Sequence, residues 1–402
     1  MKQQLSQSFS NRKIALLSII ILILLSSLYL IYNNVFEFSS YCSTVPLEDL
    51  LNYGTEIRTD GVTLVKGKPF FPFGFYHVSW ETTTQERKNA LNEIANAGFN
   101  TIHVSVTRLE DYAEFLNEAE KLGVYVISEQ NVGLLNLISA FKHKPAVLGW
   151  NIADDVDNGR FLPSKIWKLH QLVRKADHSH ITYVSGFSKR IKQFANCSDV
   201  IGMQSYPIRY GKERELSSTY SQISIARDAI SAFNRSFYAN LQTFNWSNVK
   251  PLEYKGTRTP TFKEVRNMTY QALLAGAKGI IYYTYHDSSW HLPSQSQLWN
   301  ELKFLAPEIR EISSILLEGK FQKVEANSKS IISGIWVDRN EALVVVVNTS
   351  YDRAIEIKLE LPISANTAQL LFQKNTSIKN IGSNKIHDVL QPLAVYAYKL
   401  KA

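Results

Sequence analysis

Two adjacent carboxylic acids, Asp154 and Asp155, are the residues of this chain best suited to chemistry. They follow directly on the apolar run Val147–Ala153, so two like charges leave a buried strand and enter one small space. Repulsion and partial desolvation push the pKa values of such a pair apart, so that one acid holds a proton while the other stays charged. Cleavage of a glycosidic bond needs that division, because the leaving oxygen must be protonated while a cationic sugar ring is stabilised.

A purely structural role is the alternative for these acids. Asp is common where a strand meets a helix, and Asp157-Asn158-Gly159 has the chemistry of a turn. Consecutive residues of a strand point to opposite faces, so both acids share a pocket only if the strand has ended or bulged there, as the turn residues indicate. We therefore take Asp155 and Asp154 as the catalytic candidates.

The acids belong to the fourth of eight strand-like runs, which alternate with amphipathic helical patterns between residues 70 and 317. The runs cover residues 71–76, 101–106, 124–128, 147–153, 181–186, 200–205, 237–242 and 279–285. This α/β alternation predicts a (β/α)8 TIM barrel, in which every strand delivers its C-terminal end to one face. An open doubly wound sheet is the alternative, but no Gly-x-Gly-x-x-Gly follows the first run.

The strand ends bring aromatic, amide and acidic side chains to that common face. Aromatic rings stack on sugars while amides and acids bond their hydroxyls, so the mixture predicts a carbohydrate substrate. The candidate substrate-binding residues are Tyr76, His77, Glu129, Gln204, Tyr206, Gln242, Trp246, Tyr285 and Asp287. We expect no metal and no cofactor, because the histidines form no His-x-His set and only Cys42 and Cys197 are present.

The regions outside the barrel have different patterns. Residues 318–402 alternate apolar and polar positions, with strands expected at 331–337, 342–348, 354–361, 368–372 and 393–400 and a turn at 338–340, which predicts a small antiparallel β-sandwich. Residues 38–69 form a neck that brings a short β-element to the barrel. The net charge of +8 includes no basic cluster interleaved with aromatics beyond the N-terminus, so we expect no nucleic-acid partner.

The N-terminus has the pattern of a membrane segment. Lys2, Arg12 and Lys13 precede an uncharged stretch over residues 14–36, long enough to span a bilayer. We expect residues 1–37 to be a cytoplasmic tail and an uncleaved transmembrane signal anchor, with the main domains extracytoplasmic; a cleaved signal peptide is the alternative. Six Asn-x-Ser/Thr sequons fit an exported glycoprotein: Asn196, Asn234, Asn245, Asn267, Asn348 and Asn375.

Several motifs together resemble the clan A glycoside hydrolases, and more closely β-galactosidase-like barrels with a trailing β-sandwich. They are Phe73-Gly74-Phe75-Tyr76, the segment from Leu148 to Asp155, Tyr206-Pro207, and Gly276-Ala277-Lys278-Gly279-Ile280, and the resemblance covers about residues 68 to 402. It implies Asp155 as general acid/base and Asp154 as the sugar-contacting neighbour. Strand seven should end in a nucleophilic Glu, but Gln242 stands there, and a neutral amide cannot attack the anomeric carbon.

Three hypotheses fit this departure. In the first, a 2-acetamido group of the substrate is the nucleophile, with Asp154 orienting it and Asp155 protonating the leaving oxygen, as the acid pair of O-GlcNAcase-type hexosaminidases implies. In the second, Glu129 or Asp287 activates a water. In the third, the site only binds glycans. We expect a membrane-anchored glycoside hydrolase-like protein, with a non-catalytic glycan-binding pseudo-glycosidase as the alternative.

Overall fold

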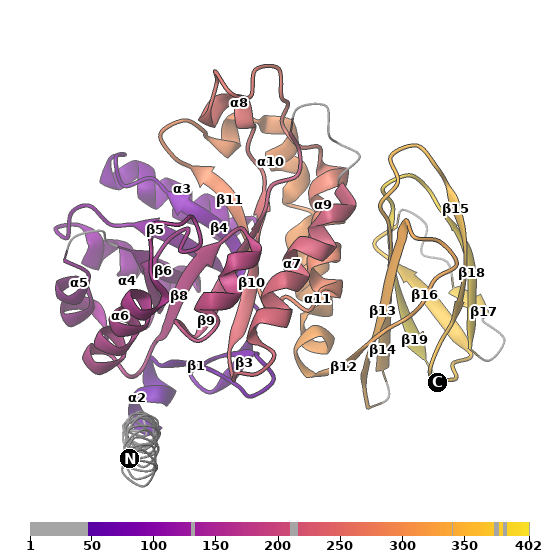
Figure 1. Ribbon diagram of the computed structural model, residues 1–402, viewed down its shortest axis with the longest axis horizontal. Helices are drawn as coiled ribbons and strands as arrows, with labels where there is room; N and C mark the ends of the chain where they lie inside the picture. Colours follow the sequence, from indigo (N-terminus) through magenta and orange to yellow (C-terminus); the bar gives the residue numbers. More distant parts are fainter. Residues whose placement is uncertain are drawn as a thin grey trace, which may run out of the picture. The chain divides into compact units, whose positions relative to one another are not determined.

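The computed structural model describes residues 47–129, 133–209, 216–339, 341–373, 378–380 and 384–401 (Figure 1). The chain divides into two compact units, residues 1–46 and residues 47–402. Within the described ranges, no helix is long and apolar enough to cross a bilayer. The expected anchor over residues 14–36, Cys42 and Asn375 all lie outside the described residues.

Eight parallel strands close into a barrel in the order β10-β11-β4-β5-β6-β7-β8-β9, which confirms the predicted (β/α)8 fold. Every strand lies within two residues of its predicted run. The strands are β4 (Phe73–Val78), β5 (Thr101–Ser105), β6 (Tyr125–Glu129), β7 (Val147–Ala153), β8 (Ile181–Gly186), β9 (Val200–Ser205), β10 (Ser236–Gln242) and β11 (Ile280–His286).

Helices surround the barrel, and local signals fix where several of them begin or end. Capping boxes start α3 at Thr83 and α9 at Thr261, each with a Glu three residues later, and Gly123 ends α4 with a φ of 68°. The helices are α3 (Thr84–Asn96), α4 (Tyr112–Leu122), α5 (Leu134–Phe141), α6 (Pro163–Ala176), η1 (Lys189–Phe194), α7 (Ser218–Ile230), α8 (Trp246–Val249), α9 (Phe262–Leu274), η3 (Leu292–Ser294), α10 (Ser296–Leu302) and α11 (Leu305–Glu318).

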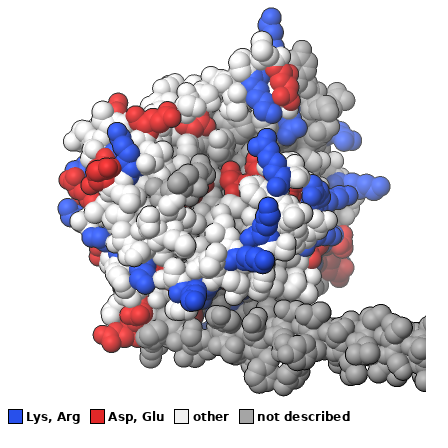
Figure 2. Space-filling view, turned by 60° about the vertical axis from the view of Figure 1, so that its left-hand side comes forward, with Lys and Arg blue, Asp and Glu red and all other residues white. Residues whose placement is uncertain are grey.

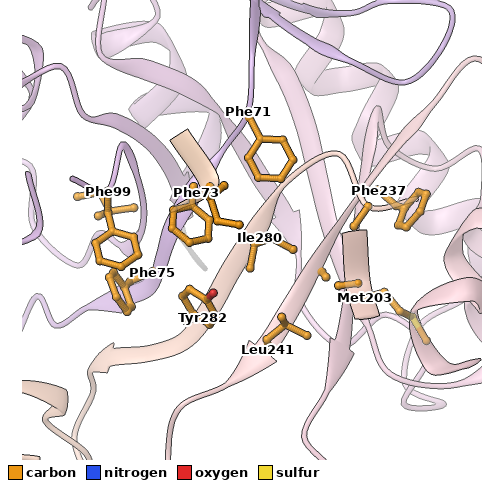
Figure 3. Packing of buried hydrophobic residues seen from close by; sticks show 14 of the residues in the cluster. Phe71, Phe73, Phe75, Phe99, Met203, Phe237, Leu241, Ile280 and Tyr282 are labelled. Carbon is orange, nitrogen blue, oxygen red and sulfur yellow. The ribbon is translucent and has the colours of Figure 1, made fainter. Parts of the chain in front are cut away.

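The two faces of each barrel strand belong to different cores. Phe73 and Phe75 of β4 point outward and pack with Phe99 and Tyr282 beneath the helices (Figure 3). A second, smaller cluster fills the barrel from inside and includes Tyr76, Ile127, Leu148, Tyr183 and Ile281. Side chains that continue this inward series toward the strand ends therefore line the barrel mouth.

The neck closes the opposite end of the barrel. It contains helix α2 (Leu47–Asn52) and a three-stranded sheet of β1 (Thr55–Ile57), β2 (Thr63–Val65) and β3 (Lys68–Phe70), which agrees with the expected short β-element. The Thr55 hydroxyl donates to Leu148 O at 2.7 Å, and the Thr63 hydroxyl lies 2.6 Å from Tyr238 Oη. Because the neck occupies the N-terminal ends of the strands, access is left to their C-terminal ends.

The C-terminal region forms the expected antiparallel β-sandwich. One sheet has the order β12-β13-β14-β19-β16-β17 and the other pairs β15 with β18. Its strands are β12 (Lys320–Lys323), β13 (Ile331–Asp338), β14 (Glu341–Asn348), β15 (Ile355–Glu360), β16 (Thr367–Leu371), β17 (Ile378–Asn380), β18 (Lys385–Leu390) and β19 (Val395–Lys401). The division of the chain at residues 69/70 and 317/318 remains a proposal.

The larger sheet of the sandwich is buried on both faces. Val344 and Val346 face the sandwich core, whereas Val345 and Val347 belong to the core shared with the barrel helices. Strand β14 therefore reads as a continuous apolar run instead of an alternating one. Strands β12, β17 and β18 were not expected from the sequence, since they are short or carry mostly polar residues.

Two of the six sequons hold the protein together instead of facing solvent. The amide of Asn267 donates to the carbonyls of Asn348 at 2.9 Å and Leu393 at 3.1 Å, and the amide of Asn348 donates to three further carbonyls. Both side chains have no exposed surface. In the folded chain these two sequons are therefore buried, and attachment of a glycan would require their amides to leave their buried partners.

Candidate active site

The strand β7 ends irregularly where the two acids follow it. Its register with β8 shifts between Asn151 and Ala153, and Asp155 has a φ of 48°. This left-handed turn breaks the alternation that would send neighbouring side chains to opposite faces. Asp154 and Asp155 are thus brought to the same hydroxyl group, that of Ser185 on β8.

Ser185 joins the two acids. Its hydroxyl donates to Asp154 Oδ1 and accepts the backbone N–H of Asp155 at 2.9 Å. From strand β9, the Gln204 amide donates to Asp155 Oδ1 at 2.6 Å and approaches Ser185 Oγ at 3.3 Å. Within the described residues, the side-chain hydrogen bond of Asp155 engages Oδ1, which leaves Oδ2 to carry a proton.

The electrostatics of the pair favour a protonated acid. Removal of water and the neighbouring charge of Asp154 raise the pKa of Asp155 to about 6, although the Gln204 hydrogen bond works against this rise. Desolvation also raises the pKa of Asp154, while the hydroxyl hydrogen bonds from Ser185 and Tyr76 favour its charged form. We therefore assign the proton to Asp155 and the charge to Asp154.

The carboxyl group of Asp154 is accessible to solvent and yet crowded by protein atoms. The Asp154 side chain is exposed, whereas Asp155 is half-buried, and yet protein atoms crowd the Asp154 carboxyl enough to raise its pKa. A side chain at the floor of an open hollow has both properties. Figure 2 shows a hollow near the middle of one face with acidic atoms inside it, and Lys and Arg side chains on that face stand among acidic and uncharged ones.

Glu129 is an anchored anion at the end of β6. Its carboxylate accepts hydrogen bonds from Ser105, Asn151 and Tyr76, and His103 Nε2 lies 3.3 Å from Oε2. Burial alone would raise the pKa of Glu129, but the hydrogen bond and charge attraction of His103 and the Ser105 hydroxyl lower it to about 2. Such a carboxylate is a weak base, because its lone pairs are already engaged.

Gln242 lies at the end of β10, as expected, but it is not open to a substrate. Its side chain has no exposed surface. Its Oε1 accepts the N–H of Ile208 at 2.8 Å, and its Nε2 donates to the carbonyls of Ile208 and Phe244, both at 3.0 Å. The predicted role in sugar binding is therefore replaced by a structural one: Gln242 holds the loop that follows β9.

Tyr285 also departs from the expectation, because it points away from the barrel mouth. Its hydroxyl donates to Glu93 of helix α3 at 2.7 Å, and its ring packs on Trp299 of α10. The register of β11 against β4 shifts between Tyr283 and His286, which turns Tyr285 toward the helices. Tyr283 is the inward residue instead, and desolvation together with Asp287, Asp154 and Asp155 raises its pKa.

Aromatic rings form one wall beside the acids. The ring of Tyr206 lies 5.8 Å from that of Tyr283 and 5.2 Å from that of Phe244, and Trp246 meets Phe244 edge to face at 4.9 Å. Tyr206 and Trp246 are half-buried, so each keeps an accessible part. Arg209 covers the ring of Trp246 at 4.7 Å.

The remaining predicted residues line the mouth with part of their polar groups occupied. Tyr76 places its hydroxyl beside Glu129, and His77 Nδ1 lies 3.2 Å from the Ser105 hydroxyl. Burial lowers the pKa of His77. Asp287 uses Oδ1 to accept the N–H groups of Ser289 and Trp290, both at 2.9 Å. Within the described ranges, no group of three His, Cys, Asp or Glu residues is arranged to hold a metal ion.

Four residues of this site were not among the sequence-based candidates: Ser185, His103, Asn151 and Tyr283. Three of them lie inside their strands, one or two residues before the end, whereas most of the selected candidates stood at the last residue of a predicted run or just beyond it. Strict alternation from Tyr183, which points into the barrel, leads to Ser185, whereas Asn151 lies three residues after the inward Leu148 and would not have been found in this way. Tyr283 required the β11 irregularity, which has no sequence signal that we recognise.

Comparison with solved structures was made for the whole fold. A GH27 β-L-arabinopyranosidase from Geobacillus stearothermophilus matches with a TM-score of 0.58 at 11% identity over 83% of this chain and 96% of that chain. An α-amylase from Geobacillus thermoleovorans gives 0.56 at 10% identity, covering 86% and 99%, and a GH30 endoxylanase from Clostridium papyrosolvens C71 gives 0.52 at 11%, covering 88% and 98%.

No protein-family model matches the sequence, and no curated protein matches it. Identities near 10% are too low to transfer substrates or roles of residues, so the matches concern architecture alone. They cover 83–88% of this chain, which is more than the barrel of residues 70–317 alone can supply. The chain thus has the TIM-barrel fold found in these glycoside hydrolases, as the sequence motifs had indicated.

Proposed function

We propose that the chain is a glycoside hydrolase in which Asp155 is the general acid. The observation that carries this proposal is the acid pair itself: burial and the neighbouring charge of Asp154 raise the pKa of Asp155 to about 6, and the Ser185 hydroxyl bonds both the Asp154 carboxyl and the Asp155 backbone N–H. An acid with a pKa near the working pH is well matched to proton donation. The fold shared with glycoside hydrolases and the aromatic wall of Tyr206 and Trp246 support a carbohydrate as the substrate.

The nucleophile in this proposal is the carbonyl oxygen of a 2-acetamido group on the substrate. Asp155 protonates the glycosidic oxygen as the bond from C1 to that oxygen breaks, and the acetamido oxygen bonds to C1. Asp154, kept charged, accepts a hydrogen bond from the acetamido N–H. A water then attacks C1 as the bond between C1 and the acetamido oxygen breaks, which restores the acetamido group, and the water gives its proton to Asp155. The occupied amide of Gln242 and the engaged carboxylate of Glu129 support a nucleophile from the substrate.

The proposal also concerns how the enzyme is anchored and on which side of the membrane it acts. The uncharged stretch of residues 14–36 supports a single-pass anchor with the barrel on the extracytoplasmic side, where it would act on glycans. In this arrangement residues 38–69 are a neck, residues 70–317 the catalytic domain and residues 318–402 a supporting domain. Asn234 is an exposed sequon, so it is the best placed of the described ones to carry a glycan.

A glycan-binding protein without turnover is the second candidate. The observation that favours it is Gln242, which stands at the usual nucleophile position and has no exposed surface. In this case the aromatic wall would hold a sugar and the acid pair would bond its hydroxyls. Binding would then survive Asp155→Asn, and no hydrolysis would be found with any substrate.

The test is a panel of aryl glycosides that includes N-acetylhexosaminides and the matching 2-hydroxy sugars. We expect release of the aryl group only from the 2-acetamido members, and loss of release in Asp155→Asn. Asp228→Asn is the matched control, because Asp228 is an exposed acid of helix α7 paired with Arg227. Equal turnover of the 2-hydroxy sugars would reject the substrate-assisted step, and glycan-array binding without any turnover would select the second candidate.

A further inference from the structure

A second cavity lies away from the acid pair, at the end of the barrel that the neck covers. It has a volume of about 290 Å³ and lies between the end of helix α7, the start of strand β10, the turn before β11 and the sandwich strands β12 and β13 (Figure 1). Its lining combines cations with aromatic rings: Arg227, Phe233, Arg235, Lys278, Phe321 and Trp336. Neither the acid pair nor the aromatic wall of the barrel mouth contributes to it.

The ammonium group of Lys278 is the main reason to expect a ligand in this cavity. Its side chain is half-buried, and burial lowers the pKa of its ammonium group. Within the described part of the chain, its Nζ makes no hydrogen bond and no ion pair. A desolvated ammonium group without an acceptor is costly, and an anion that entered the cavity would remove this cost.

Two acids, Asp60 and Glu318, lie near Lys278, but both of them already bind Arg58. Asp60 is the acid of the lining, and Arg58 already neutralises it through hydrogen bonds of 2.9 and 2.8 Å. Arg235 pairs with Asp199 at 3.3 Å, but its buried Nε has no hydrogen-bond partner. Among the described residues, Lys278 Nζ and Arg235 Nε, which belong to two residues of the lining, therefore lack acceptors.

The rest of the lining is apolar and partly open. Phe233 is 42% exposed and Phe321 is 39% exposed, which is unusual for large aromatic side chains, while Trp336 is buried behind them. An apolar group that covered these rings would bury their surface. The cavity therefore offers an anionic contact and an apolar contact side by side.

We propose that this cavity binds a small amphipathic anion, a carboxylate or phosphate that carries an apolar group, with Lys278 and Arg235 holding the anion and Phe233 and Phe321 covering the apolar part. The volume suits a ligand of a few to about twenty heavy atoms, at the small end of protein ligand sites. The site is independent of the hydrolytic proposal, since none of its residues contacts Asp154 or Asp155.

The test uses the full chain in a nonionic detergent and three probes measured by isothermal titration calorimetry. Phenyl phosphate carries both features, inorganic phosphate only the charge, and benzyl alcohol only the ring. We expect phenyl phosphate to bind at least about tenfold more tightly than either of the others. Equal affinity for benzyl alcohol would reject the anion contact, and equal affinity for inorganic phosphate would reject the apolar contact.

Substitutions of lining residues test whether phenyl phosphate binds in this cavity. Lys278→Gln should weaken phenyl phosphate about tenfold or more, whereas Lys250→Gln, a change at an exposed lysine paired with Glu253, should leave it unchanged. Unaltered affinity of Lys278→Gln would overturn the proposal, as would the absence of binding to the unaltered chain up to about 10 mM. Should Lys278→Gln fail to fold, Phe321→Ala serves instead: its affinity for phenyl phosphate should fall to that for inorganic phosphate, and an unchanged affinity would reject the site.

Discussion

Gln204 donates its side-chain amide to Oδ1 of Asp155 at a distance of 2.6 Å. The donor lies on β9, and the acid follows β7, so two strand ends separated by β8 meet over the barrel. A hydrogen bond to the charged form of an acid lowers its pKa. Gln204 thus acts against the burial and the charge repulsion that raise the pKa of Asp155, and it sets how far that pKa rises.

Replacement of Gln204 by Met should therefore raise the pKa of Asp155. Methionine has nearly the same shape but no N–H to donate, so the charged form of Asp155 loses a partner. We expect the alkaline limb of the pH profile of kcat/KM to move upward by about half a unit to one unit. Gln85→Met is the matched control, because Gln85 is exposed on helix α3 and its side chain donates to Asn89 of the same helix. A limb that stays in place would show that Gln204 does not act on Asp155.

Asp155→Asn should abolish proton donation to the leaving oxygen. We expect kcat to fall by about 100-fold or more with little change in substrate binding, since the amide keeps the shape of the acid. A general acid must be protonated, so activity of the unaltered chain should decline as the pH rises through about 6, and the variant should lack that limb. The apparent value belongs to the Asp154 and Asp155 pair, because their titrations are coupled.

The choice of leaving group distinguishes a loss of proton donation from a loss of substrate positioning in Asp155→Asn. An aryl glycoside with a good leaving group needs less protonation, so its turnover by Asp155→Asn should be impaired less than that of a poor leaving group. Equal losses for both would show that Asp155 positions the substrate and does not supply a proton. Unchanged turnover for both would remove Asp155 from the mechanism.

Glu129→Gln should reduce stability in a pH-dependent way. The folded state lowers the pKa of Glu129 from 4.5 to about 2, so the charged carboxylate stabilises the fold above pH 4.5 and this contribution is lost as the pH falls toward 2. At pH 7 the variant should lose about 3 kcal/mol of unfolding free energy, because Ser105, Asn151 and His103 would face an amide instead of an anion.

Chemical denaturation at pH 7 and at pH 3 measures this effect. The difference between Glu129→Gln and the unaltered chain should shrink at the lower pH, while the exposed Glu356→Gln serves as the control. A loss of stability that is the same at both pH values would mean that packing, and not the charge of Glu129, is responsible.

Much of the fold could be predicted from the hydrophobic periodicity and the composition of the sequence. The runs that became β7, β8 and β9 were located without error because buried parallel strands are continuous apolar stretches flanked by helical periods. Strand β18 (Lys385–Leu390) was missed, since only Ile386 and Leu390 are buried and the polar residues between them resemble a loop. Sequence periodicity detects a strand through its core face, and an edge strand with few core residues gives little signal.

The site could be predicted less completely than the fold. Sequence patterns predict where a residue lies along a strand, but not which way its side chain points at the strand end. Asp154 and Asp155 were recognised because their types and their place after a strand are local features. Tyr285 and Gln242 were correctly placed at strand ends, but one points to Glu93 and the other bonds the backbone of Ile208. Which way a side chain points at a strand end depends on bulges and on the loop from a neighbouring strand, and both are tertiary properties.

Gln242→Glu distinguishes a lost nucleophile from a structural amide. If the position were an idle catalytic site, a carboxylate there would restore a nucleophile and raise turnover of 2-hydroxy glycosides. The structure predicts the opposite, because the carboxylate would replace an amide that donates to the carbonyls of Ile208 and Phe244. Two carbonyl oxygens would then face a buried acid, which we expect to cost about 1–3 kcal/mol of unfolding free energy.

This loss of stability in Gln242→Glu should grow as the pH rises, since burial keeps the new acid protonated at low pH. Denaturation of the variant at pH 5 and at pH 8 measures it, with Gln85→Glu as the exposed control, and a variant as stable as the unaltered chain that gains turnover would contradict the structural role.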